Sequence, residues 1–214
     1  MTKLPRIKVC GLATVADVQT ALDAGADALG FVHYEPSPRH LDVEQARALA
    51  AEVPADVWTV AVVVDCAPDT LRALIAGGGL RAVQLCGDEH PADFANFDVP
   101  VLRRVAVDAH ALGELERWRD VATGFVLDHP DAPGGTGRSV NLELAAHLAR
   151  RAACLLAGGV GPDNVAARVG VVQPAGVDAS SRLESAPGQK DHAAVRAFVR
   201  TARAALAARP GKER

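Results

Sequence analysis

Short apolar runs alternate along the chain with longer segments in which apolar residues recur at helical spacing. The continuous apolar run at residues 57–64 is typical of a parallel strand that is covered on both faces. We predict eight strands, at residues 6–10, 28–32, 57–64, 81–85, 101–105, 124–128, 153–157 and 176–178. Helices are predicted after them, at residues 15–24, 42–51, 69–76, 91–97, 109–118, 142–150, 162–169 and 192–208.

Eight strand-helix units in 214 residues leave about 27 residues for each unit. That is close to the lower size limit of a closed eight-stranded barrel, and nothing remains for a second domain. A doubly wound open sheet is the alternative, but the first strand is followed by Cys10-Gly11-Leu12 rather than a dinucleotide fingerprint. We therefore expect the α/β class, with a single (β/α)8 TIM barrel as the catalytic domain at residues 1–206 and a polar tail at 207–214.

Composition narrows the range of partners. The formal net charge is −3, so the chain lacks the basic surface that nucleic-acid binding requires. No apolar run approaches the roughly 20 residues of a membrane-spanning helix, and the first residues lack the apolar core of a signal peptide. We expect a cytoplasmic protein with neither nucleic acid nor a membrane as partner. Four separate cysteines, with no C-x-x-C pair, predict reduced thiols and no metal site.

In a barrel of this kind, the residues at the carboxyl ends of the strands converge on one mouth. The first strand ends in Lys8-Val9-Cys10-Gly11, and strand alternation directs Lys8 and Cys10 to the same side, which we expect to be the inside. Cys10 is a candidate base or nucleophile, although a small buried core residue is the commoner use of cysteine. Asp128 ends the sixth strand, where a cap or loop acceptor is the alternative. Together the two residues form a credible acid-base pair.

The last two strand exits carry small donor-rich residues. Gly158 and Gly159 follow the seventh strand, and Ser180 and Ser181 follow the eighth. These are the positions where barrels often bind phosphate, so phosphate binding is favoured over tight turn geometry alone. A glycine-rich loop containing Gly135 is weaker evidence of the same kind, and Arg39 in the second loop is a candidate for an anionic ligand.

Taken together, the motifs at the ends of the predicted strands resemble those of the phosphoribosylanthranilate isomerase family of tryptophan biosynthesis. The motifs that carry the resemblance are K-V-C-G at 8–11, G-F-V-H…S-P-R at 30–39, Q-L-C-G-D at 84–88, G-G-T-G at 134–137, L-A-G-G-V-G-P-D-N-V at 156–165, G-V-D-A-S-S-R-L-E at 176–184 and P-G-Q-K-D at 187–191. They stand in the family's order and span nearly the whole chain.

The resemblance implies a (β/α)8 barrel that converts N-(5-phospho-β-D-ribosyl)anthranilate to carboxyphenylamino-deoxyribulose 5-phosphate by an Amadori rearrangement. It implies no metal, no organic cofactor and no obligate protein partner. By motif, Cys10 is the expected general base and Asp128 the general acid. Substrate binding is expected of Lys8, Arg39 and Gln84, with Arg39 on the anthranilate carboxylate. Phosphate binding is expected of Gly135, Gly158, Gly159, Ser180 and Ser181.

Such a mechanism needs a lowered cysteine pKa, for which Lys8 is the expected cause, and a raised aspartate pKa, for which repulsion from Asp178 is expected. Three positions depart from the family pattern: Cys86 replaces a histidine, His33 an aromatic residue and Arg182 a glycine whose backbone geometry arginine would enter at a cost.

Two other functions compete with this one. A phosphate-binding barrel isomerase acting on an aminoimidazole carboxamide ribotide is disfavoured, because that reading expects an acidic residue where Cys10 stands. A noncatalytic ligand-binding barrel is disfavoured by the presence of both Cys10 and Asp128. The sequence does not decide between monomer and homodimer.

Overall fold

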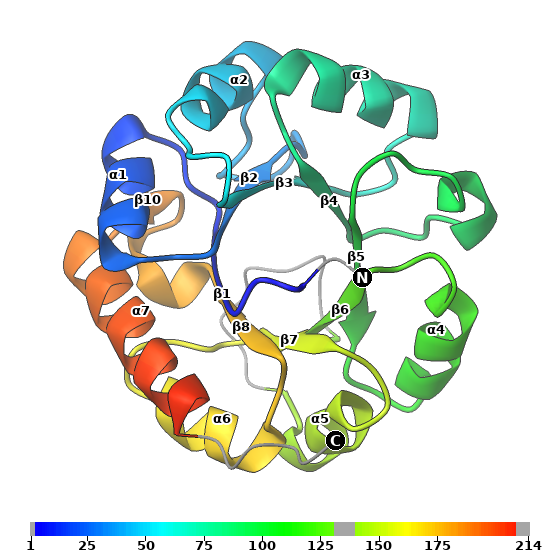
Figure 1. Cartoon of the computed structure of the whole chain (residues 1–214), viewed down its shortest axis with the longest axis vertical. Helices are drawn as coiled ribbons and strands as arrows, with labels where there is room; N and C mark the ends of the chain where they lie inside the picture. Colours follow the sequence, from blue (N-terminus) through cyan, green and yellow to red (C-terminus); the bar gives the residue numbers. More distant parts are fainter. Residues whose placement is uncertain (1–2, 131–139, 209–214) are drawn as a thin grey trace.

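Eight parallel strands pair in chain order and close into a barrel in the computed structural model, which describes residues 3–130 and 140–208 (Figure 1). The strands are β1 (Ile7–Cys10), β2 (Ala28–Val32), β3 (Trp58–Val63), β4 (Ala82–Leu85), β5 (Val101–Ala106), β6 (Gly124–Asp128), β7 (Cys154–Leu156) and β8 (Gly176–Ala179). Parallel pairing of β1 with β8 completes the ring, with Lys8 opposite Asp178. The predicted barrel is thus confirmed over the open sheet.

Helices surround the barrel on its outside (Figure 1). They are α1 (Val15–Ala24), α2 (Val43–Ala51), α3 (Pro68–Gly78), α4 (Ala111–Trp118), α5 (Leu142–Ala149), α6 (Val165–Val172) and α7 (His192–Ala207). The helix predicted at 91–97 is instead a 3-10 turn, η1 (Pro91–Phe94). Only Phe94 of that turn is buried, so the segment has no apolar stripe with which to pack a longer helix.

Local sequence signals explain where the helices begin and end. Thr14 caps α1 by accepting from the Asp17 amide, while the Asp17 carboxylate accepts from the Thr14 amide. Gly25 ends the same helix in the left-handed conformation, at φ 89°. Asp42 and Gln45 repeat the reciprocal cap at the start of α2.

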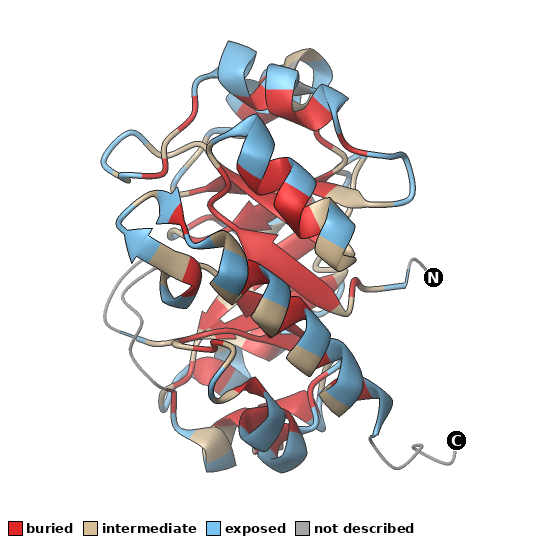
Figure 2. Ribbon diagram, turned by 90° about the vertical axis from the view of Figure 1, so that its left-hand side faces the viewer, coloured by how far each residue is buried: buried red, intermediate tan, exposed pale blue. Residues whose placement is uncertain are grey.

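Two apolar layers pack on the two faces of the strands. Ile7 and Val9 of β1 point outward into the large cluster between strands and helices. Cys10 belongs to a smaller cluster inside the barrel, with residues such as Val60, Leu102 and Leu155. Figure 2 shows the result, with buried strands inside and helices exposed on their outer faces. Strand alternation therefore directs Lys8 and Cys10 inward, as predicted.

A small hairpin follows β8 that the apolar pattern does not predict. It consists of a 3-10 turn η2 (Ser181–Leu183) and two antiparallel strands, β9 (Glu184–Ala186) and β10 (Gln189–Lys190). The strands are only three and two residues long, too short for a period to show in the sequence. At the end of the chain α7 reaches Ala207, the first residue of the predicted polar tail, and residues 209–214 lie outside the described part.

Among the described residues, no helix is long and apolar enough to cross a membrane. The four cysteines are free, as predicted.

Candidate active site at the carboxyl ends of the strands

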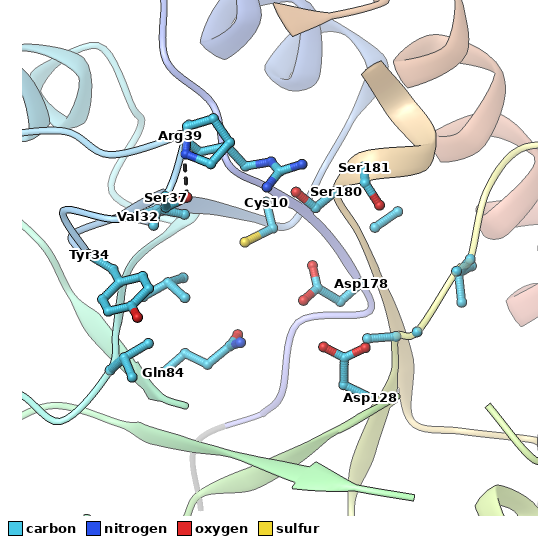
Figure 3. Close-up of a pocket in the computed structure, with 18 of the residues that line it drawn as sticks. Cys10, Val32, Tyr34, Ser37, Arg39, Gln84, Asp128, Asp178, Ser180 and Ser181 are labelled. Atoms are coloured by element: carbon cyan, nitrogen blue, oxygen red, sulfur yellow. Dashed lines mark hydrogen bonds between the residues drawn. The ribbon is translucent and has the colours of Figure 1, made fainter. Parts of the chain in front are cut away.

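A cavity of about 270 Å³ opens at the carboxyl ends of the strands. Its lining includes most of the residues singled out by sequence, namely Cys10, Arg39, Gln84, Asp128, Gly158, Gly159, Ser180 and Ser181. Figure 3 shows side chains from opposite sides of the barrel pointing into this one space. Two predicted residues are not among those that line it: Lys8 lies beneath the cavity, and Gly135 lies outside the described residues.

Cys10 is the last residue of β1 and is 7% exposed. It pairs in register with Gly30 of β2, where an added Cβ would lie 2.7 Å from the Cys10 Sγ. The lack of a side chain at Gly30 therefore leaves room for the Cys10 thiol. Burial raises the pKa of the Cys10 thiol, although the ammonium groups of Lys8 and Lys190 act in the opposite direction. The predicted lowering of this pKa is wrong for the free protein, because desolvation outweighs the nearby positive charge.

Lys8 has no exposed surface, and its Nζ donates to Asp178 Oδ2 at 2.9 Å. A direct substrate contact by Lys8, as expected from the motif, does not fit this position. Asp178 reaches the cavity in its place: its Oδ1 is buried and accepts no hydrogen bond from the described residues. Figure 3 shows this carboxylate between Cys10 and Asp128. The ion pair thus leaves one buried carboxylate oxygen beside the cavity without a hydrogen bond from the described residues.

Asp128 ends β6 on the side of the cavity away from Cys10 (Figure 3). Its Oδ1 accepts from the His129 amide at 2.8 Å, and its Oδ2 lies 3.6 Å from Arg104 Nε. Burial raises the pKa of the Asp128 carboxyl, and repulsion from Asp178 adds to the rise, whereas Arg104 opposes it. The predicted direction is confirmed, but desolvation is the main cause and the like charge a smaller one.

Arg39 extends from the loop after β2 and lies above Cys10 and beside Ser180 (Figure 3). Its Nε and Nη2 donate to the two carboxylate oxygens of Glu184, each at 2.7 Å. Lys190 Nζ donates to Glu184 Oε1 at 2.6 Å. Glu184 and Lys190 belong to the quoted motifs, but the sequence alone assigned them no role. Arg39 and Glu184 are 145 residues apart, and a motif does not indicate which distant side chain its residues contact.

An apolar wall completes the Arg39 side of the cavity, formed by Val32, Tyr34, Val62 and Val64. Gln84 lies beside it with a buried Oε1 that has no hydrogen-bond partner among the described residues. Its Nε2 donates to the sulfur of Cys86 at 3.4 Å. Burial raises the pKa of the Cys86 thiol to about 12, so this substitute for the family's histidine is a neutral group.

The two glycines after β7 adopt left-handed backbone conformations, at φ 65° for Gly158 and 75° for Gly159. Arg168 Nη1 donates to the Gly158 carbonyl at 2.8 Å, and Asn164 Nδ2 to the Gly159 carbonyl at 3.0 Å. Because side chains of α6 and its N-cap occupy the carbonyls, the amide edge of this loop is the one available to a ligand. An anion is the ligand that such an edge favours.

Arg182, which stands in place of a glycine, enters no strained backbone. It lies in η2, and the described non-glycine residues with positive φ are Asp65 and Gln173. Its guanidinium reaches outward to Asp163 Oδ2 at 2.6 Å. The expectation of a conformational cost at this position is therefore wrong.

Comparison with known proteins places the chain in one family. The family model described as N-(5'-phosphoribosyl)anthranilate isomerase matches residues 7–201. The enzyme of that name from Myxococcus xanthus is 44% identical over 207 residues, covering 92% of this chain and 96% of its own.

Solved structures of the same family superpose on this chain. Phosphoribosyl anthranilate isomerase from Thermotoga maritima superposes with a TM-score of 0.86 at 30% identity, over 94% of this chain and 100% of that one. Another structure of the isomerase, in complex with reduced 1-(o-carboxyphenylamino)-1-deoxyribulose 5-phosphate, gives 0.83 at 30% identity with the same coverage. The chain belongs to the N-(5'-phosphoribosyl)anthranilate isomerase family.

Proposed function

We propose that Cys10 and Asp128 catalyse, in this cavity, the isomerisation of N-(5'-phosphoribosyl)anthranilate that defines the family. The observation that carries the proposal is their placement on opposite sides of one cavity (Figure 3). A sugar held between them would have a base on one side and an acid on the other. Proton transfer at two separate atoms of one substrate requires such a placement.

The substrate's two ends differ in chemistry, and so do the two ends of the cavity. We place the phosphate on the amide edge of Gly158 and Gly159 and on Ser180 and Ser181, with Gly135 also assigned to this group by motif. The anthranilate ring then lies against the wall of valines and Tyr34, with its carboxylate on Arg39. The binding energy of these ends holds the reacting sugar carbons in place.

Asp178 and Gln84 line the space between the two ends, and each has a buried oxygen that accepts no hydrogen bond from the described residues. Both are acceptors, so both suit the sugar hydroxyls as donors. Lys8 acts through Asp178 in this arrangement: its ammonium fixes the carboxylate, and its charge favours the thiolate form of Cys10.

The reaction then proceeds in balanced proton transfers. Asp128 donates its proton to the furanose ring oxygen, and the C1'–O bond breaks to leave a cationic iminium. The Cys10 thiolate removes the C2' proton, giving a neutral enolamine, which tautomerises to the ketone. The raised pKa of Asp128 increases the fraction of this carboxyl that carries the proton to be donated. The positive charge of the iminium forms in the same cavity as Cys10. It therefore favours the thiolate at the step in which Cys10 removes the C2' proton.

The test is to purify Cys10→Ala and Asp128→Asn and to measure turnover together with the affinity for the reduced product analogue. We expect kcat to fall by about a thousandfold or more in each, while the dissociation constant changes by less than about threefold. Cys66→Ala is the matched control, because this half-buried thiol lies outside the cavity lining, and its turnover should stay normal. Normal turnover in Cys10→Ala would overturn the assignment of the base.

A further inference from the structure

We infer that the β9–β10 hairpin orients Arg39 for the substrate carboxylate, through Glu184 and Lys190. The inference rests on the proposed role of Arg39 and adds a reason for its selectivity. Glu184 and Lys190 touch Arg39 or its partner rather than the cavity, so they are positioning residues.

Glu184 occupies only one edge of the Arg39 guanidinium. A guanidinium has five N–H donors in a rigid plane. Glu184 accepts from Nε and Nη2, the pair along the side of the plane. No hydrogen bond from the other edge, formed by Nη1 and the second proton of Nη2, is made to the described residues, so this edge is left for the carboxylate of a ligand. Such an edge offers two parallel donors and matches the two oxygens of a benzoate-type group.

Glu184 and Lys190 form a buried pair of opposite charge beside Arg39. The Glu184 side chain is 3% exposed and that of Lys190 is fully buried, so neither exchanges readily with water. Arg39, Glu184 and Lys190 together carry a net charge of +1. Lys190 balances Glu184, and the charge of Arg39 therefore stays available to an anionic ligand. Lys190 Nζ also donates to the Ser180 carbonyl at 3.3 Å, which ties the hairpin to the phosphate side of the cavity.

The hairpin packs closely on the loop that carries Arg39. Gly188, in the turn of the hairpin, has φ 81°, and a Cβ there would lie 2.6 Å from the Pro38 carbonyl oxygen. On the other side, a Cβ at Gly11 would lie 2.5 Å from Arg39 Cδ. The arginine stem and its loop are thus held between the exit of β1 and the hairpin, which leaves the guanidinium little freedom to turn.

Glu184→Gln separates positioning from simple attraction, because the two effects change the affinity for an anionic ring differently. The substitution removes one negative charge and leaves the positive charge of Arg39. Burial lowers the pKa of Lys190 and Glu184 opposes that lowering, so the net charge of the cluster becomes +2 while Lys190 is protonated and stays at +1 once Lys190 is neutral. Attraction alone would therefore leave the affinity unchanged or raise it, whereas loss of the positioning contact would lower it, since the guanidinium must then be ordered at the moment of binding.

The experiment uses two ligands and calorimetric dissociation constants. One ligand is the reduced product analogue, and the other is the same molecule with a phenyl group lacking the carboxylate. For Glu184→Gln we expect the carboxylated ligand to bind about tenfold more weakly and the phenyl ligand to change by less than about threefold. In turnover assays KM should rise more than kcat falls. Equal weakening of both ligands, or tighter binding of the carboxylated one, would overturn the inference.

Three further variants make the result interpretable. Lys190→Met keeps both bonds from Arg39 to Glu184, and we expect a smaller change in the ratio of the two constants than for Glu184→Gln. Glu89→Gln is the matched control: it removes the negative charge of a buried carboxylate that accepts from Arg103 at 2.7 Å, outside the cavity lining, and should leave the ratio unchanged. Arg39→Ala tests the underlying function: unchanged carboxylate selectivity there would refute the role of Arg39 itself rather than that of the hairpin.

Discussion

Burial acts on Cys10 and Asp128 in the same direction, although the reaction needs opposite protonation states from them. It raises the pKa of both groups. A raised carboxyl pKa helps Asp128 to keep the proton it must donate, whereas a raised thiol pKa keeps on Cys10 the proton it must lose. The active form, a thiolate facing a carboxylic acid, is therefore a minor form of the free protein.

This order of pKa values predicts the pH dependence of kcat/KM. Below the pKa of Asp128 the thiolate is scarce, and above the pKa of Cys10 the carboxylic acid is scarce, so activity falls on both sides of a broad plateau. We expect the midpoint of the ascending limb at a pH above the ordinary carboxyl pKa, and the midpoint of the descending limb at a pH above the ordinary cysteine pKa. A pH-rate series with constant ionic strength measures both limbs. An ascending limb at or below the ordinary carboxyl value would contradict the raised pKa of Asp128.

At the scale of elements, β1 presents the Cys10 thiol at its exit only because the neighbouring strand β2 makes room for it. Gly30 of β2 lies beside Cys10 of β1, and a methyl group there would meet the thiol sulfur at 2.7 Å. We expect Gly30→Ala to displace the Cys10 side chain and to lower kcat by about tenfold or more, since small misplacements of a reacting group are costly. Steady-state kinetics with the natural substrate measures this effect.

A second glycine serves as the control for that variant. Gly113 lies in α4, and a Cβ added there meets no atom within 4 Å. Gly113→Ala should therefore leave kcat unchanged and raise the free energy of unfolding by about 0.5–1 kcal/mol, because alanine loses less conformational freedom than glycine in a helix. If both variants lowered kcat alike, crowding at Cys10 would not be the cause.

At the scale of the whole molecule, closure of the barrel brings Lys8 onto Asp178, 170 residues later in the chain. Removing one partner of a buried pair leaves the other charge uncompensated. We expect Lys8→Met to lower the free energy of unfolding by about 3–5 kcal/mol, and addition of Asp178→Asn to recover part of that loss. Urea unfolding monitored by circular dichroism measures both.

An exposed ion pair provides the comparison. Arg72 and Asp69 on α3 lie 2.8 Å apart, with side chains 45% and 97% exposed. Arg72→Met should change the free energy of unfolding by less than about 1 kcal/mol. A loss as small as this in Lys8→Met would mean that the barrel closes without help from its internal pair.

Some features of the fold and the site follow from the sequence, and others do not. The eight strands follow from apolar runs, and the placement of Cys10 and Asp128 follows from their positions at strand exits. The site of Lys8 beneath the cavity does not follow, because strand alternation says which face a residue takes but not its depth. The pairing of Arg39 with Glu184 does not follow either, since it depends on how two loops pack across the mouth.

The sequence by itself determined the order of strands and helices and most of the residues at their exits, because periodicity and chain order are properties of local segments. It favoured the closed barrel through the length of each unit and the missing dinucleotide fingerprint, and the tertiary structure decided the closure. Only the tertiary structure decided the direction of the Cys10 pKa, the buried pair of Lys8 and Asp178, and the hairpin that holds Arg39. Desolvation and ion pairing depend on which atoms surround a group in space, and those atoms come from distant parts of the chain.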